Sequence, residues 1–198
     1  MNIVFDLGMV LIEWDPRHLY RKVFDDAGKM EWFLTHVCHN EWNLEQDRGR
    51  RWDDAIAEAT SRHPAMASEI RLFRERWMDM VPGAIAGSVA ILEDLHSRGA
   101  ALYAITNWNG ETFRDTRSRF GFLSLFRDIV VSGDEGIIKP DPAIFALLCR
   151  RNDLNAPECL FIDDSLKNVR GAEAVGWQAH HFTSPDALRA DLQSRGLL

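Results

Sequence analysis

Acidic side chains follow short apolar runs at two places in this 198-residue chain. Asp6 comes after residues 3–5, and the pair Asp163-Asp164 comes after residues 159–162. Each carboxylate alone could form a turn or cap a helix, because Asp favours both positions. Three clustered carboxylates repel one another unless a proton or a cation intervenes. If the fold brings them together, they indicate a cation site.

Three further polar residues follow apolar runs. Thr106 and Asn107 come after residues 101–105, and Lys139 lies in the loop after residues 128–131. They could simply satisfy backbone groups or face solvent, yet with the carboxylates they suit phosphoryl transfer. Mg²⁺ accepts hard oxygen ligands and bridges them to phosphate, while Lys139 can neutralise charge and Thr106 can donate to a phosphoryl oxygen. Asp6 could then attack phosphorus and form an aspartyl-phosphate.

These side chains need a sheet to bring them together. The pattern predicts five strands, over residues 3–5, 101–105, 128–131, 159–162 and 178–182. Helical periodicity lies between them, as in Val89, Leu92 and Leu95. Alternating strands and helices predict an α/β fold, with a Rossmann-like parallel sheet covered by helices on both faces. Ligands bind beyond the carboxyl ends of the strands in such sheets, where these polar residues fall.

One segment interrupts this alternation. Residues 16–80 contain no convincing strand, and four charged, helix-compatible stretches cover residues 18–24, 31–37, 51–60 and 67–77. We therefore predict a core domain of residues 1–15 and 81–198 and an inserted small helical cap of residues 16–80. Within the insert, Asp47-Arg48-Gly49 is interpreted as a break between helices. A surface ion pair is the preferred interpretation of Arg48, although it could also reach a substrate.

Four segments resemble the ordered motifs of the haloacid dehalogenase superfamily. They are Phe5-Asp6-Leu7-Gly8-Met9-Val10, Thr106-Asn107, Lys139-Pro140 and Phe161-Ile162-Asp163-Asp164-Ser165. The insert is similar to that superfamily's small helical cap. Residues 163–168, followed by Gly171-Ala172 and Gly176, resemble its phosphatase branch. The Asp-Leu-Gly form of the first motif resembles a subgroup that includes bacterial alpha-glucose-1-phosphate phosphatases.

The resemblance implies a Mg²⁺ site and a catalytic pair. Asp6 would be the nucleophile and a metal ligand, and the backbone carbonyl of Gly8 would bind the metal too. Asp164 would be the main distal ligand, with Asp163 binding directly or through water. Lys139 would act with Asp6 in catalysis.

Further residues are implied to bind the substrate. The resemblance has Thr106, Asn107 and Lys139 hold the phosphate. Asn168 lies four residues after Asp164, so one helical turn could return it to the site, although it could equally be a surface amide. Trp108 directly follows Asn107 and is a pocket candidate, with core packing as the alternative.

One position departs from the family pattern. Most phosphatases of this superfamily carry a second aspartate two residues after the nucleophile, where it protonates the leaving oxygen and later activates water. This chain has Gly8 there. General acid–base catalysis contributes roughly 10²–10⁴-fold. Turnover then requires a good leaving group, water or another residue to replace that aspartate.

Composition narrows the classes of partner. The net charge of −7 argues against general binding to nucleic acids or anionic membranes, because both require basic surface. The three cysteines suggest neither a disulfide framework nor a zinc site, which favours a cytoplasmic location. A small phosphate ester is the predicted partner. The sequence leaves the choice between monomer and homodimer open.

The leading hypothesis is a phosphatase for a small phosphorylated metabolite, which could be a sugar phosphate. A haloacid dehalogenase is the nearest alternative, in which the aspartate attacks carbon without a metal; that branch usually lacks the Asp163-Asp164 pair. A degenerate binding or regulatory module is the other alternative. Gly8 favours such a module, whereas Asp6, Lys139 and Asp164 oppose it, since an inactive site has no chemical need for all three.

Overall fold

The computed structural model describes residues 1–198 and contains one parallel sheet. Its strands lie in the order β3-β2-β1-β4-β5. Their bounds are β1 Asn2–Phe5, β2 Ala101–Thr106, β3 Asp128–Val131, β4 Cys159–Asp163 and β5 Gln178–His181. The predicted α/β fold with a Rossmann-like parallel sheet is confirmed, and each predicted strand falls within about one residue of an observed one.

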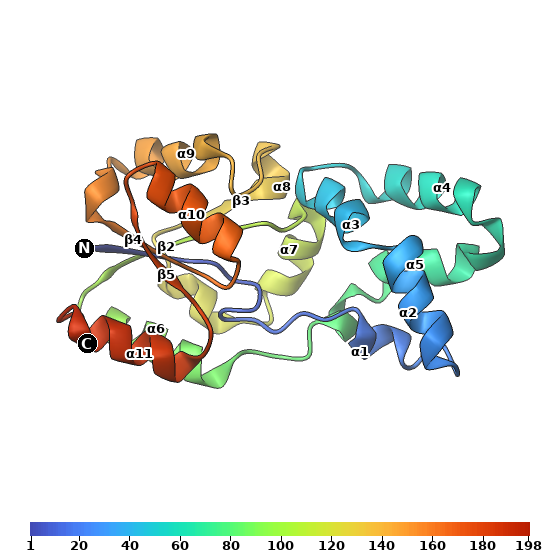
Figure 1. Cartoon of the computed structure of the whole chain (residues 1–198), viewed down its shortest axis with the longest axis horizontal. Coiled ribbons are helices and arrows are strands. Elements are labelled where there is room, and N and C mark those ends of the chain that lie inside the picture. The colour runs from blue at the N-terminus through green and yellow to red at the C-terminus, as the bar shows by residue number, and fades with distance from the viewer.

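Helices cover both faces of the sheet. In this part of the chain they are α6 Ala86–Ser97, α7 Gly110–Arg117, α8 Ser132–Glu135, α9 Pro142–Asn152, α10 Leu166–Ala174 and α11 Pro185–Ser194, with 3-10 turns η3 Gly121–Leu125 and η4 Ala156–Glu158. Figure 1 shows α9 and α10 above the strands and α6 and α11 below them. Side chains alternate across β1, so that Val4 packs on one face while Ile3 and Phe5 pack on the other.

Between β1 and β2 the chain forms a helical insert, defined here as residues 16–80. Its helices are α1 Arg17–Tyr20, α2 Ala27–His36, α3 Asn40–Asp47, α4 Trp52–Arg62 and α5 Ala67–Glu75, with 3-10 turns η1 Pro64–Met66 and η2 Trp77–Met80. The insert lies beyond the carboxyl ends of the strands, opposite the two termini (Figure 1). It has an aromatic centre in which Phe73 lies 5.3 Å from Trp42 and 5.8 Å from Trp52, between ring centroids.

Helix α3 is the element of the insert that the sequence patterns did not predict. It begins after His39, whose Nδ1 accepts a hydrogen bond from the backbone N–H of Trp42 at 3.2 Å. Its other end is bound to the sheet domain. Asn109 Nδ2 donates to the carbonyl of Gln46 at 3.0 Å, and Ser132 Oγ donates to the carbonyl of Asp47 at 2.5 Å. Tertiary contacts therefore stabilise a helix that its own sequence specifies weakly.

The two crossings between sheet domain and insert lie side by side. The backbone N–H of Glu13 donates to the carbonyl of Gly83 at 3.0 Å, and that of Asp15 donates to the carbonyl of Met80 at 3.0 Å. One cluster of buried apolar side chains runs from the insert into the sheet domain without interruption. We keep the division at residues 15 and 81 as a proposal, and the insert is packed against the sheet domain in this structure.

Two smaller expectations can be compared with the structure. Cys38, Cys149 and Cys159 are free thiols, as expected from their spacing. In the insert, His36 stacks on Trp32 with ring centroids 4.9 Å apart, and Cys38 is buried. None of the helices has the length and apolar character that crossing a membrane would require.

Substitution of Asn109 tests whether this residue holds α3 against the sheet domain. Its Oδ1 accepts hydrogen bonds from the backbone N–H groups of Glu111 and Thr112, so Asn109→Ala removes the cap of α7 as well as the bond to α3. We expect a loss of about 1 kcal/mol in the free energy of unfolding, together with faster hydrogen exchange across α3.

Ser184 provides the matched control for this substitution. It caps α11 through the backbone N–H of Ala187 and makes no contact with α3, so Ser184→Ala should cost a similar free energy while leaving exchange in α3 unchanged. Equal exchange of α3 in the two variants would contradict the role given to Asn109.

Candidate active site

Asp6 stands at the carboxyl end of the central strand. Its backbone N–H donates to the carbonyl of Ile162 at 2.8 Å, which extends the pairing of β1 with β4 by one residue. The side chain is buried, and its Oδ1 accepts a hydrogen bond from the backbone N–H of Leu7 at 2.7 Å. The strand therefore fixes the position of this carboxylate, while the loop behind it fixes its orientation.

Lys139 joins the two ends of the carboxylate cluster. Its Nζ lies 2.8 Å from Asp6 Oδ1 and 2.7 Å from Asp163 Oδ2, and its side chain has no exposed surface. Burial lowers the pKa of Lys139, but the charges of Asp163 and Asp6 outweigh that effect and hold the pKa above its ordinary value. Burial raises the pKa of Asp6, and the Lys139 charge opposes that rise. The ammonium thus remains charged beside the carboxylate at neutral pH.

Asp163 is fully engaged by protein donors. Besides Lys139, it accepts hydrogen bonds from the backbone N–H of Ser165 at 2.8 Å and from Asn168 Nδ2 at 3.1 Å to each oxygen. The predicted turn of α10 does return Asn168 to the site. There it meets the carboxylate of Asp163, so the structure gives Asn168 a positioning contact at the edge of the predicted substrate site.

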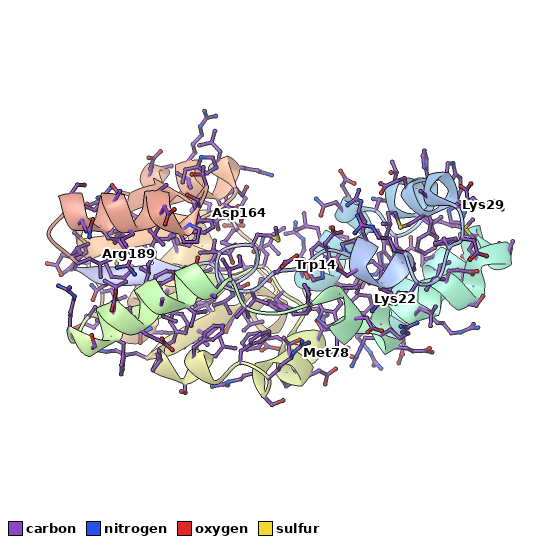
Figure 2. The ribbon with its side chains drawn as sticks, turned by 90° about the horizontal axis from the view of Figure 1, so that it is seen from below. Trp14, Lys22, Lys29, Met78, Asp164 and Arg189 are labelled. Atoms are coloured by element: carbon purple, nitrogen blue, oxygen red, sulfur yellow. The ribbon has the colours of Figure 1, made fainter.

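Asp164 differs from its neighbour because its carboxylate pairs with no side chain and is exposed to solvent. Figure 2 shows it on the sheet domain near the crossing to the insert. Desolvation and the negative charge of Asp163 raise the pKa of Asp164. One carboxylate oxygen from each of Asp6, Asp163 and Asp164 lies within 4.8 Å of the others.

This donor set suits Mg²⁺. Ligand oxygens about 2.1 Å from Mg²⁺ would lie about 3 Å apart when adjacent and about 4.2 Å apart when opposite. The observed limit of 4.8 Å is close to those spacings, so small side-chain movements would complete the geometry. Hard carboxylate oxygens are also the preferred chemistry for this ion. The carboxylates of Asp6, Asp163 and Asp164 therefore fit a Mg²⁺ ion.

Thr106 and Asn107 lie at the end of β2, beside this cluster. Thr106 is buried, and its Oγ1 has no hydrogen-bond partner in the protein, which leaves it available to a ligand. Asn107 bonds the backbone of Lys139 in both directions: its Oδ1 accepts from the N–H at 2.7 Å, and its Nδ2 donates to the carbonyl at 3.2 Å. The Asn107 amide therefore positions the lysine loop, while the Thr106 hydroxyl faces no competing partner.

A cavity of about 190 Å³ opens between the insert and the sheet domain. Ten residues line it: Gly8, Met9, Trp14, Asn40, Asn43, Leu44, Asp47, Trp77, Asn107 and Trp108. The three indoles form a continuous wall, with Trp77 centred 6.0 Å from Trp14 and 6.2 Å from Trp108. Figure 2 shows Trp14 between the two parts of the molecule. Trp108, a pocket candidate in the sequence, thus reaches the cavity, where Trp14 and Trp77 join it.

The cavity has open space at Gly8, the position where the sequence resemblance implies an aspartate. A Cβ placed on Gly8 would meet no heavy atom within 4 Å. Met9 follows with φ of 57° and a side chain that is 43% exposed. Left-handed backbone of this kind is uncommon for residues other than glycine. The turn therefore directs Met9 to the cavity and leaves the position of the missing acid empty.

Sequence patterns missed Asp47. It was interpreted as part of a break between helices, yet it ends α3 and is buried in the cavity lining. Burial raises its pKa to about 7, against the opposing effects of the Asn109 backbone N–H and of Lys139. Sequence patterns carried no signal for this role, because the burial of Asp47 depends on tertiary packing. Arg48 behaves as expected, since its Nε lies 3.8 Å from Glu45 Oε1 at the surface.

Comparisons with known proteins agree with this geometry. A sesquiterpene phosphatase, astK of Aspergillus oryzae, is 30% identical over 98% of this chain and 95% of its own length. A phosphoserine phosphatase of Thermus thermophilus is 32% identical over 67% of this chain and 53% of its own. The HAD family enzyme BT-2542 of Bacteroides thetaiotaomicron superposes with a TM-score of 0.73 at 21% identity, covering 92% of this chain and 93% of its own; it has also been crystallised with magnesium and inorganic phosphate.

The family model for haloacid dehalogenase-like hydrolases matches residues 2–176, a span that contains Asp6, Thr106, Lys139 and Asp163-Asp164. The four motifs, the Rossmann-like sheet and this match agree. The chain belongs to the haloacid dehalogenase-like hydrolase family.

Proposed function

We propose that this hydrolase is a Mg²⁺-dependent phosphatase that works through an aspartyl-phosphate on Asp6. The observation that carries the proposal is the ammonium of Lys139, held within 2.8 Å of both Asp6 and Asp163, beside the free carboxylate of Asp164. Such a cluster is built to bind a cation together with an anion. The phosphatase names of the relatives support it.

The residues of the chain have distinct parts in the reaction. An oxygen of Asp6 attacks phosphorus while the bond from phosphorus to the leaving oxygen breaks, which transfers the phosphoryl group to the carboxylate. Lys139 offsets the negative charge of the phosphoryl oxygens, and the Thr106 hydroxyl can donate to one of them. Water then cleaves the aspartyl-phosphate and restores Asp6.

Asp6, Asp164 and the Gly8 carbonyl would hold Mg²⁺, which when bound supplies positive charge to the phosphoryl group. Asp163 accepts bonds from Lys139, Asn168 and the backbone of Ser165, so its contribution to the ion is through water or through the orientation of Lys139. The paired acids and the lysine together favour this reaction over metal-free dehalogenation and over a binding module without turnover.

The cavity favours a substrate with an apolar carbon skeleton. Trp14, Trp77, Trp108, Met9 and Leu44 supply most of its surface, and no basic or acidic residue other than Asp47 lines it. Asn40, Asn43, Asp47 and Asn107 are the polar side chains of the lining, and a sugar would bury the rest of its hydroxyl groups against indole and aliphatic surface, which costs free energy. We therefore propose an apolar phosphate monoester in place of the sugar phosphate that remained open, in agreement with the name of the astK relative. We keep the cytoplasm as the proposed location.

Replacing each acid of the pair tests the metal assignment. Asp164→Asn should weaken Mg²⁺ binding more than Asp163→Asn does, because only Asp164 has a carboxylate free of protein partners. Calorimetric titration of Mg²⁺ into both variants measures this difference. Phosphatase activity should also disappear in excess EDTA and return with Mg²⁺. Equal or reversed losses of affinity, or full activity after verified metal removal, would contradict the assignment.

A substrate panel tests the nature of the pocket. We expect kcat/KM to be at least about tenfold higher for prenyl monophosphates than for glucose 1-phosphate or phosphoserine, because apolar burial of a group of this size contributes about 1.5–3 kcal/mol. Leu44→Asn should remove most of that preference by placing an amide in the cavity wall.

Leu147 is the matched control for Leu44. It is a half-buried leucine on α9 that packs against a cluster of apolar side chains containing no residue of the insert, so Leu147→Asn should leave the preference between substrates intact. A wild-type preference for the sugar phosphates would reject the apolar assignment while leaving the phosphatase proposal standing.

A further inference from the structure

The reaction proposed above lacks an identified proton donor. The leaving oxygen of a phosphate ester gains negative charge as its bond to phosphorus breaks, and a poor leaving group needs a proton at that moment. Gly8 occupies the position where the family usually places the acid, and the space around it is open. A donor supplied by the protein has to come from another element that lines the same cavity.

Asp47 is the one titratable side chain among the ten cavity residues. It lies on α3 of the insert, lines the same cavity as Gly8, and is buried. One carboxylate oxygen, Oδ2, accepts a hydrogen bond from Asn43 Nδ2 at 3.2 Å. The Asn43 Oδ1 atom on the same side chain is buried without a partner. Asn43 and Asp47 thus form a hydrogen-bonded polar pair in a cavity wall whose other side chains are mostly aromatic or aliphatic.

The backbone around Asp47 is fixed to the two loops that carry the phosphate-site residues. Ser132, at the end of β3, donates to the carbonyl of Asp47 itself, and Asn109, three residues after Thr106, donates to the carbonyl of the preceding Gln46. These bonds join the insert to the sheet domain at the residue in question. Packing of the insert onto the sheet domain therefore determines where the Asp47 carboxyl stands relative to Asp6.

We propose that Asp47 is the general acid and base of this enzyme, delivered to the site by the insert in place of an acid at Gly8. The inference rests on the proposed phosphatase function and concerns which residue moves the protons. It makes Asp47 a catalytic residue that touches the leaving group, and it gives the docking of α3 a chemical purpose.

The proton balance is simple. In the first step Asp6 forms a bond to phosphorus, the bond from phosphorus to the ester oxygen breaks, and the Asp47 carboxyl gives its proton to that oxygen, so the alcohol leaves neutral. In the second step the Asp47 carboxylate takes a proton from water as the water oxygen attacks phosphorus. The bond from phosphorus to Asp6 breaks, phosphate leaves, and both side chains return to their starting states.

The electrostatics of the site agree with this assignment. Burial raises the pKa of Asp47 to about 7, so both protonation states are populated near neutral pH. Lys139 opposes this rise, as does the backbone N–H of Asn109. Other charged groups near α3 are paired with one another: Asp134 with Arg114, Glu135 with Arg151, and Arg50 with Glu58.

Leaving-group dependence tests the proposal. We expect kcat/KM of the wild-type enzyme to vary only weakly with the pKa of the leaving group across aryl and alkyl phosphates. Asp47→Asn should make that dependence steep, with a loss of roughly 10²–10⁴-fold on alkyl phosphates and a much smaller loss on 4-nitrophenyl phosphate, whose leaving group needs no proton. Adding Gly8→Asp to Asp47→Asn should restore activity on alkyl phosphates by about tenfold or more, since the space at Gly8 is open.

Glu45→Gln is the matched control, because Glu45 lies on the exposed side of the same helix and pairs only with Arg48. It should keep the wild-type dependence. Equal losses of Asp47→Asn on aryl and alkyl phosphates would overturn the role of Asp47. Failure of the wild-type enzyme to hydrolyse any phosphate ester with Mg²⁺ would instead overturn the proposed function, so the two failures are distinguishable.

The pH dependence of thermal stability tests the protonation of Asp47 without an activity measurement. A carboxyl whose pKa is higher in the folded state than in the unfolded chain destabilises the fold as pH rises, because the unfolded chain releases its proton first. For Asp47 this loss falls between its ordinary value of 3.8 and about 7. The Tm of Asp47→Asn minus that of the wild type should therefore increase from pH 4 to pH 7.5. A difference that stays constant over this range would overturn the protonated carboxyl that the proposal requires.

Discussion

The contact of one ammonium with two carboxylates is the interaction on which the rest of the site depends. Lys139 lies within 2.8 Å of Asp6 and of Asp163, all three buried at the carboxyl edge of the sheet. Breaking a buried ion pair by removing one partner costs about 3–5 kcal/mol, so none of the three side chains can be removed independently. The surrounding amides follow from this: Asn107 fixes the lysine backbone, and Asn168 fixes the carboxylate opposite.

The contact with Lys139 also gives the adjacent acids Asp163 and Asp164 different roles. Asp163 points into the protein because β4 continues through it, and there it is saturated with donors. Asp164 is the first residue beyond the strand, so alternation of the backbone turns it to the open side. Two identical residues in sequence therefore acquire different chemistry from a difference of one position along a strand.

Much of the sheet domain could be predicted from the sequence because its strands are apolar runs that end abruptly at polar residues. Asp6, Thr106 and Asp163 mark those ends, and parallel pairing must gather them at one edge. The partners of Asn107 and Asn168 could not be predicted, since spacing reveals proximity but not which atom accepts a bond. Helix α3 was missed because it is short and polar, and because the groups that hold it, Asn109 and Ser132, are far away in the chain.

The paired crossings have a consequence for how such enzymes diversify. The backbones of Glu13 and Gly83 are hydrogen-bonded where the chain leaves and rejoins the sheet domain. This bond holds the two ends of the intervening segment together, whatever the sequence of that segment. Leu44, Asp47 and Trp77 of this segment line the cavity. With Asp47 as the acid, replacing the segment would change both the substrate that the cavity accepts and the group that supplies the proton, so a transplanted insert would need an acid of its own.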